Sequence, residues 1–395
     1  MNEDSSPLRS DLIARATAGE KGLRRRVVIG MALAPMLAAG PSLAAVTVRA
    51  EPALARGVNL THWFEYERGQ SVTPREMNDL RTAGFDHVRI PVDPAVFGWT
   101  PQRDAAVTFL KPLRAAIDAA LQADLAVVVD MHPTGETKQL IEDEFARETA
   151  LIGLWTTIAA ALADTPHDRV ALELLNEPQY YGMASTRWPG FQKRLLAAVR
   201  PAMPRHLVLL TGARGSSAEG LAMLDPVADP RVAYTFHFYL PYLFTHQGAD
   251  WMDTRWTTAG LHSDVRYPAS AQRGRTPVLS QPHPSAAREM ASYLGDDWRA
   301  ERIAQAMQHA LAWAGKHGKR VLCNEFGVIR AGVQPASRYR WIADVRSVLD
   351  ANGIGWTVWD YTDIFGITAQ SASLQSQGAR TVDAEALQAL GLKAS

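Results

Sequence analysis

The 395-residue chain contains a single cysteine, Cys323, and no excess of charge of either sign. One cysteine excludes a disulfide within the chain. The 41 basic and 41 acidic residues give a formal net charge of +0, and no basic stripe or acidic tail interrupts the sequence. This balance gives no support to nucleic-acid binding. A hydrophobic content of 47% is that of an ordinary globular protein with a sizeable core.

An apolar run of membrane-spanning length is also missing, because the stretch 27–40 is too short to cross a bilayer. It follows three arginines at 24–26 and ends in small residues at 41–45. This order predicts an export signal over residues 1–45. The pair Arg24-Arg25 resembles a twin-arginine signal, and a general secretory signal fits nearly as well. We therefore expect a periplasmic or secreted protein with no membrane span in its mature chain, residues 46–395.

The mature chain alternates short apolar runs with longer amphipathic segments. Strands are expected at 57–60, 87–92, 125–132, 170–177, 206–212, 232–239, 320–327 and 355–361, and helices at 74–83, 110–122, 144–163, 188–203, 301–317, 337–352 and 384–392, with a weak helical turn near Glu219. Thr73 and Pro74 fit the N-cap and first position of a helix. Apolar strands covered on both faces indicate a parallel sheet. Eight such units predict a single α/β domain, a (β/α)8 TIM barrel, with a long insertion over 240–298.

An open doubly wound sheet is the alternative to the closed barrel. That fold requires a glycine-rich fingerprint after its first strand. Here Leu60 is followed by Thr61-His62-Trp63-Phe64, which contains no glycine. The sequence therefore favours the barrel, in which chemistry gathers where the strands meet the loops that follow them.

Polar residues stand at those strand ends. Two apolar runs end in a glutamate, Glu177 after Asn176 and Glu325 after Asn324. The other strand ends supply Arg89, Asp130, His132, His237, Tyr239 and Trp359. A charged side chain at the end of a buried strand is costly unless it has partners or a task. Paired carboxylates are what glycoside hydrolysis requires. Cys323 shares a strand face with Glu325 by alternation, and we interpret it as a small buried hydrophobe rather than a nucleophile.

From Gly57-Val58-Asn59 to Trp359 these residues resemble glycoside hydrolase family 5, the cellulase-like family of retaining β-glycanases. The resemblance implies that Glu177 is the general acid/base and Glu325 the nucleophile. It also implies that Asn176 bonds the 2-hydroxyl of the sugar. The same resemblance makes Arg89 and Tyr239 the hydrogen-bond partners of the nucleophile, His132 and His237 pocket histidines, and Trp359 the platform on which a sugar stacks.

The chemistry of such a pair requires two different protonation states. Arg89 and Tyr239 are expected to keep Glu325 anionic. Burial and the neighbouring Glu325 are expected to raise the pKa of Glu177, so that it can donate a proton. The predicted function is a secreted glycoside hydrolase that cleaves β-linked glucan, as an endo-β-1,4-glucanase, without cofactor or metal and as a monomer.

Several alternatives remain open from the sequence alone. Within the same fold, the substrate could be β-mannan or β-1,3-glucan. A zinc hydrolase could use His132 and His237 with Asp130 or Glu325, although His62 stands alone where many such barrels have a pair of histidines. A non-catalytic polysaccharide-binding barrel is the remaining class. We also expect Trp251 or Trp256 of the insertion to contact a sugar, unless both serve only to fix the insertion to the barrel.

Overall fold

The computed structural model describes residues 51–65, 71–97, 103–249, 251, 260, 262–279, 284–368 and 380–393. The predicted signal at 1–45 and Trp256 lie outside these residues. Within this described part, no helix combines the length and the apolar character needed to cross a membrane.

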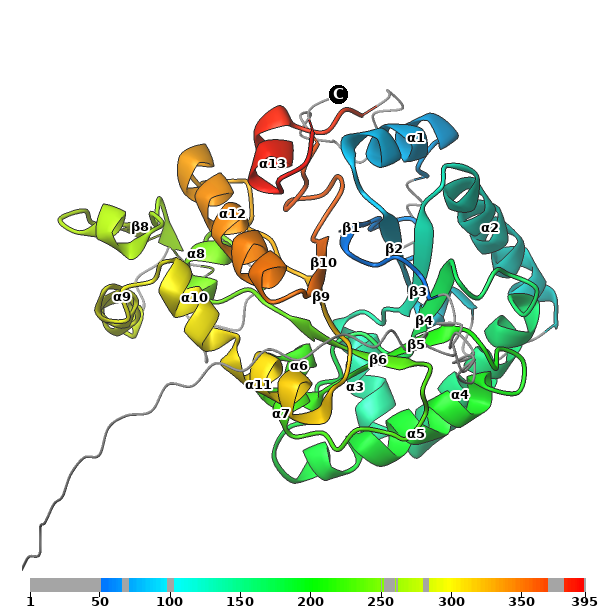
Figure 1. The fold of residues 1–395 in the computed structure, drawn as a ribbon. Coiled ribbons are helices and arrows are strands. Elements are labelled where there is room, and N and C mark those ends of the chain that lie inside the picture. Colours follow the sequence, from blue (N-terminus) through cyan, green and yellow to red (C-terminus); the bar gives the residue numbers. More distant parts are fainter. Residues whose placement is uncertain are drawn as a thin grey trace, which may run out of the picture. The chain divides into compact units, whose positions relative to one another are not determined.

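Eight parallel strands close into a barrel, as the sequence predicts (Figure 1). They are β1 (Arg56–Asn59), β2 (His87–Val92), β3 (Ala126–Met131), β4 (Val170–Glu173), β5 (Leu207–Thr211), β6 (Val232–His237), β9 (Val321–Glu325) and β10 (Gly355–Val358). Neighbouring strands in space follow the chain order, and β10 pairs with β1 to complete the closure. All strand carboxyl ends therefore meet at one end of the barrel.

The helices lie outside the strands, most of them in a ring around the barrel and α9 farther out (Figure 1). They are α1 (Pro74–Ala83), α2 (Arg103–Gln122), α3 (Gly135–Asp143), α4 (Phe145–Ala161), α5 (Trp188–Val199), α6 (Ala213–Ser216), α7 (Ala218–Ala222), α8 (Tyr242–Thr245), α9 (Ala286–Gly295), α10 (Ala300–Ala306), α11 (Gln308–His317), α12 (Pro335–Ala351) and α13 (Ala384–Ala389). Helix α1 begins as expected, because Thr73 accepts from the backbone of Glu76 while Glu76 caps Thr73 in return.

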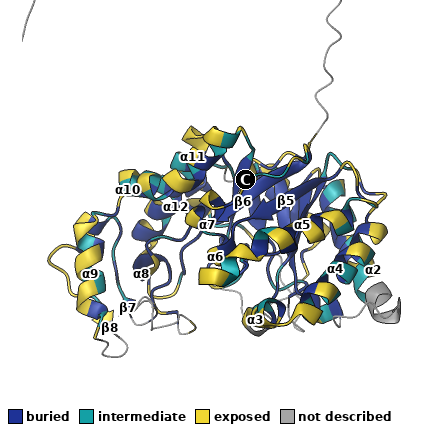
Figure 2. Cartoon of the chain, turned by 90° about the horizontal axis from the view of Figure 1, so that it is seen from below, coloured by how far each residue is buried: buried dark blue, intermediate teal, exposed yellow. Residues whose placement is uncertain are grey.

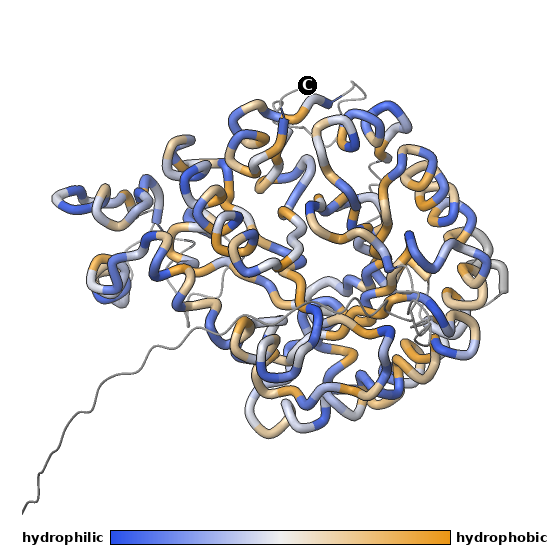
Figure 3. Tube along the Cα trace, in the orientation of Figure 1, coloured by the Kyte–Doolittle hydropathy of each residue, from blue (hydrophilic) through white to orange (hydrophobic). Residues whose placement is uncertain are grey.

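Alternation along the strands divides the core into two parts. Inside the barrel, Ala126, Val128, Ala171 and Leu322 belong to a small apolar cluster. The outward strand residues join a larger cluster with the helices. Strands β5 and β6 are buried along their length, whereas the helices expose their outer faces (Figure 2). Hydrophobic residues gather along the strands and on the helix sides that face them (Figure 3). The barrel is thus a filled core, with its polar layer above the apolar one.

The structure adds detail to the expected elements and corrects one of them. No element was expected between the third strand and the helix at 144–163, and α3 forms there ahead of α4. The helix expected over 301–317 divides at Met307, where Ala310 bonds back three residues instead of four. The insertion contains α8, α9, a 3₁₀ turn and a two-stranded sheet of β7 (His262–Ser263) and β8 (Val278–Leu279), and its buried side chains belong to the same large cluster as those of the barrel.

Candidate active site

The Arg89 guanidinium occupies the centre of the polar layer inside the barrel. It is fully buried and bonds three carboxylates: Nη1 to Glu325 at 2.8 Å, Nε to Glu173 at 2.8 Å and Nη2 to Asp130 at 2.9 Å. Nη2 also donates to Oδ1 of Asn176 at 2.9 Å. Burial opposes the charge, but these carboxylates outweigh it and raise the pKa of Arg89 well above its usual value. Arg89 therefore fixes the positions of several strand-end side chains at once.

Glu325 lies at the end of β9 with one oxygen on Arg89. Its other oxygen accepts from the Tyr239 hydroxyl at 3.0 Å and lies 3.4 Å from Nδ1 of His237. Its side chain is 4% exposed. Burial, followed by the charge of Glu325, raises the pKa of Tyr239 well above the usual value, so the phenol stays a donor. Both expected partners of Glu325 are thus in place.

A local irregularity in the ladder brings Glu325 to this position. The register between β6 and β9 shifts between Phe236 and His237, so that His237 pairs with Glu325 while Phe236 pairs with Cys323. An extra residue in one strand changes the direction of the side chains that follow it. Cys323 consequently lies buried in the larger core cluster, while Glu325 reaches Arg89. The expectation that these two residues share a face is wrong for this reason.

Glu177 lies beyond strand β4, which ends four residues earlier, at Glu173. The expected strand 170–177 is therefore too long. Glu177 has a φ of 44°, in the left-handed region that non-glycine residues seldom adopt. One of its oxygens accepts from Lys138 of α3 at 2.9 Å, and the other from Nδ1 of His237 at 3.1 Å. Its side chain is 26% exposed and faces the cleft.

The protonation of Glu177 differs from the expectation. Burial favours the neutral acid, but Lys138 and His237 outweigh it and hold the pKa of Glu177 well below its usual range. The expected rise in the pKa of Glu177 is wrong, because it took no account of the contact with Lys138. Burial likewise lowers the pKa of His237, but Glu325 and Glu177 outweigh it and raise that pKa overall.

The two glutamates share one pocket. One oxygen of each and a ring nitrogen of His237 lie within 4.8 Å of one another. In the described ranges, these three residues are the group that could ligate a metal ion. The ammonium of Lys138 at Glu177 and the guanidinium of Arg89 at Glu325 compete with such an ion. His132, which a zinc site was expected to use, bonds Asp130 instead.

His132 and Asn176 form a second chain of contacts on Arg89. Nδ1 of His132 bonds Asp130 at 2.8 Å, and Nε2 faces the amide nitrogen of Asn176 at 3.2 Å. This assigns the hydrogen to Nδ1 and makes Nε2 an acceptor. Burial lowers the pKa of His132 to about 4, so the ring is neutral near pH 7. The Asn176 amide is thereby held by two partners, with one of its hydrogens left for a ligand.

Aromatic side chains are part of the lining of the cleft, whose volume is about 910 Å³. Trp359 stacks on His132, with ring centres 5.4 Å apart and planes 14° apart. Tyr181, Tyr242 and Trp251 are 56%, 42% and 55% exposed and line the cleft. Flat aromatic faces suit the apolar faces of sugar rings.

The structure thus brings together the eight residues to which the family resemblance gave a role. It also adds residues that the sequence analysis did not single out. Glu173 is buried against Arg89 and Asn324, and strand alternation from Ala171 could have identified it as facing inward. Lys138 lies on a helix that was not expected, so no sequence signal pointed to it.

Comparisons with known proteins agree with this geometry. A family model described as Cellulase (glycosyl hydrolase family 5) matches residues 48–364. Endoglucanase C of Acetivibrio thermocellus is 27% identical over 323 residues, covering 77% of this chain and 90% of that protein. Endoglucanase 3 of Fibrobacter succinogenes is 25% identical over 344 residues, covering 80% of this chain and 50% of that protein. The match therefore spans only half the length of this second relative.

Solved structures share the fold at low sequence identity. Endoglucanase Cel5A from Thermotoga maritima superposes with a TM-score of 0.66 at 23% identity, covering 85% of this chain and 97% of that one. The cellulose synthase subunit Z (CcsZ) from Clostridioides difficile gives a TM-score of 0.65 at 21% identity, with coverages of 86% and 99%.

Proposed function

The chain is a cellulase-like member of glycosyl hydrolase family 5, and from this membership we propose that it is a secreted, retaining endo-β-1,4-glucanase. The observation on which the mechanism depends is the spacing of Glu177 and Glu325, which have oxygens within 4.8 Å of each other. Carboxyl groups about 5–5.5 Å apart suit a retaining mechanism, whereas an inverting one needs room for a water between them.

In the first step Glu325 is the nucleophile. Arg89 and Tyr239 orient its carboxylate, and one oxygen forms a bond to the anomeric carbon of the sugar. The glycosidic bond breaks at the same carbon, and the leaving oxygen takes the proton carried by Glu177. Asn176 offers its free amide hydrogen to the 2-hydroxyl, a contact that strengthens in the transition state.

In the second step Glu177 is the base. It removes a proton from water, whose oxygen attacks the anomeric carbon while the ester bond to Glu325 breaks. Lys138 and His237 stabilise the anionic form of Glu177 that this step requires. Glu177 regains the proton that it gave in the first step, Glu325 is released as a free carboxylate, and the sugar keeps its original anomeric configuration.

The substrate assignment is supported by the relatives and by the cleft. Endoglucanase C and Endoglucanase 3 are named for internal cleavage of glucan. The cleft carries Trp359 together with Tyr181, Tyr242 and Trp251, so it offers aromatic contacts at several points instead of one. A chain of sugars bound across both glutamates would then be cut internally.

Two measurements test this function. Carboxymethyl cellulose, mannan, lichenan and laminarin should be compared, with product lengths resolved; we expect mixed oligosaccharides from β-1,4-linked glucans and little from laminarin. Faster cleavage of mannan than of glucan would identify β-mannan as the substrate instead.

Glu177→Ala should stall on an activated aryl glycoside after the first step, and azide should restore turnover by forming the β-glycosyl azide. Native rates on polysaccharide in both Glu177→Ala and Glu325→Gln would contradict the assignment of the catalytic pair, whereas no turnover of any glycan by the unsubstituted protein would favour a binding protein.

A further inference from the structure

Lys138 is an unexpected cation beside the proposed proton donor. It comes from α3, and its ammonium lies 2.9 Å from Oε2 of Glu177. The Lys138 side chain is only 13% exposed, so water screens this contact weakly. No residue matched by the family resemblance supplies this charge, and the proposed first step requires Glu177 to be protonated.

Both oxygens of Glu177 already accept from donors, Lys138 on one and His237 on the other. A proton on either oxygen would turn one of these contacts into a donor facing a donor. On the side of the barrel interior, Glu325 lies close to Glu177 and is paired with Arg89. The other titratable side chains that line this part of the cleft are Tyr181, Arg214, Tyr242 and His246. Protonation of Glu177 therefore requires that either Lys138 or His237 give up its hydrogen bond to the Glu177 carboxylate.

A second carboxylate, that of Glu142, lies on the same helix as the Lys138 ammonium. Glu142 lies four residues after Lys138 on α3, the spacing at which side chains face each other. Glu142 accepts from the backbone nitrogen of Gln179. Burial raises the pKa of Glu142 to about 7, and the charge of Lys138 acts in the opposite direction. Release from Glu177 need not leave Lys138 without a partner.

Building on the proposed function, we propose that Lys138 is a positioning residue that controls when Glu177 can donate its proton. In the free enzyme its ammonium holds Glu177 as a carboxylate, and the first chemical step proceeds only in molecules where that contact has opened. The same charge assists the second step, in which Glu177 must be a base. Lys138 thereby confines cleavage of natural glycosidic bonds to the acid side of neutrality.

The test is the pH profile of kcat/KM for Lys138→Met on two substrates. A cello-oligosaccharide needs a proton on its leaving oxygen, whereas 2,4-dinitrophenyl β-cellobioside does not. With the oligosaccharide, we expect the basic limb to move to higher pH by about one unit or more, because removal of the cation favours protonated Glu177. With the aryl glycoside, we expect no movement of that limb.

Matched variants isolate the charge from the fold. Lys138→Arg keeps the cation and should keep the limb near that of the wild type, while Lys193→Met removes an exposed lysine of α5 and should change neither profile. An unchanged limb in Lys138→Met, or an equal shift on both substrates, overturns the inference. If Glu177→Gln cleaves the oligosaccharide at the native rate, the proposed function itself is wrong. If Glu177→Gln is inactive and the basic limb of Lys138→Met does not move, only the role of Lys138 is rejected.

Discussion

At the scale of single residues, Arg89 determines the geometry of the site. It is 0% exposed and contacts Asp130, Glu173 and Glu325 together. Three carboxylates would repel one another in the low-dielectric interior without the guanidinium between them. The planar fork of arginine reaches all three at once, which a lysine ammonium could not do with the same geometry. Stability and activity are therefore linked through this one side chain.

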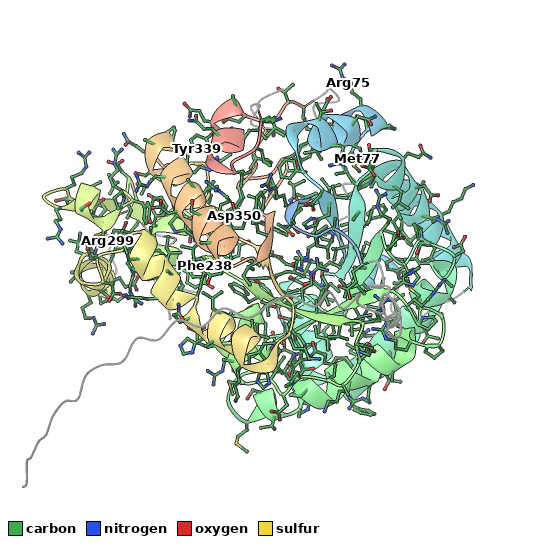
Figure 4. All side chains as sticks on the ribbon, in the orientation of Figure 1. Arg75, Met77, Phe238, Arg299, Tyr339 and Asp350 are labelled. Carbon is green, nitrogen blue, oxygen red and sulfur yellow. The ribbon has the colours of Figure 1, made fainter. Side chains whose placement is uncertain are left out.

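Arg89→Met should lower the free energy of unfolding by about 3–5 kcal/mol, because it leaves buried carboxylates without their cation. Arg89→Lys should fold better yet lose most of its kcat, since the charge remains and the fork is lost. Urea unfolding and kcat on an aryl glycoside measure the two effects. Arg75→Met is the matched control, because Arg75 points away from the barrel and is 78% exposed (Figure 4). Equal midpoints for Arg89→Met and the control would contradict this account.

At the scale of elements, the insertion after β6 divides into two parts. Its first part, with α8 and Trp251, lines the cleft. Its later part, with the β7–β8 pair and α9, lies outside the ring of helices (Figure 1). Within the described residues of the insertion, the part that lines the cleft is therefore the part next to β6. Trp251 is 55% exposed, which favours a binding role over a packing role.

Trp251→Ala should raise KM on long glycans several-fold and leave a short aryl glycoside almost unchanged, because only a remote sugar contact is lost. Thermal unfolding should move little, since the side chain is mostly exposed. Phe145→Ala removes an aromatic side chain that is 71% exposed and does not line the cleft, so it is the matched control. A lower melting temperature with equal losses on every substrate would instead assign Trp251 to packing.

At the scale of the whole molecule, we propose that export and catalysis belong to separate parts of the chain. The proposed signal occupies residues 1–45, and the family match begins at residue 48. Removal of the signal would leave every barrel strand intact, because β1 starts at Arg56. The catalytic domain is therefore proposed to act as a monomer of residues 46–395 outside the cytoplasm.

Mass spectrometry of exported protein should find a mature N-terminus near Ala45 or Val46. Replacement of Arg24 and Arg25 by lysine should block export if the twin-arginine route is used, and should leave it nearly unchanged on the general route. Exported protein that still begins at Met1 would exclude a cleaved signal.

The sequence by itself determined the barrel and most of its site. Periodicity and capping act within a few residues, so α1, the eight strands and the polar strand ends were readable without coordinates. Only the tertiary structure decided the register shift at His237, the left-handed backbone of Glu177 and the ion pair of Glu177 with Lys138, 39 residues away. These features depend on how loops from different strands pack at the barrel end. Local sequence signals do not encode such contacts. These contacts nevertheless set the protonation state of Glu177, the proposed acid.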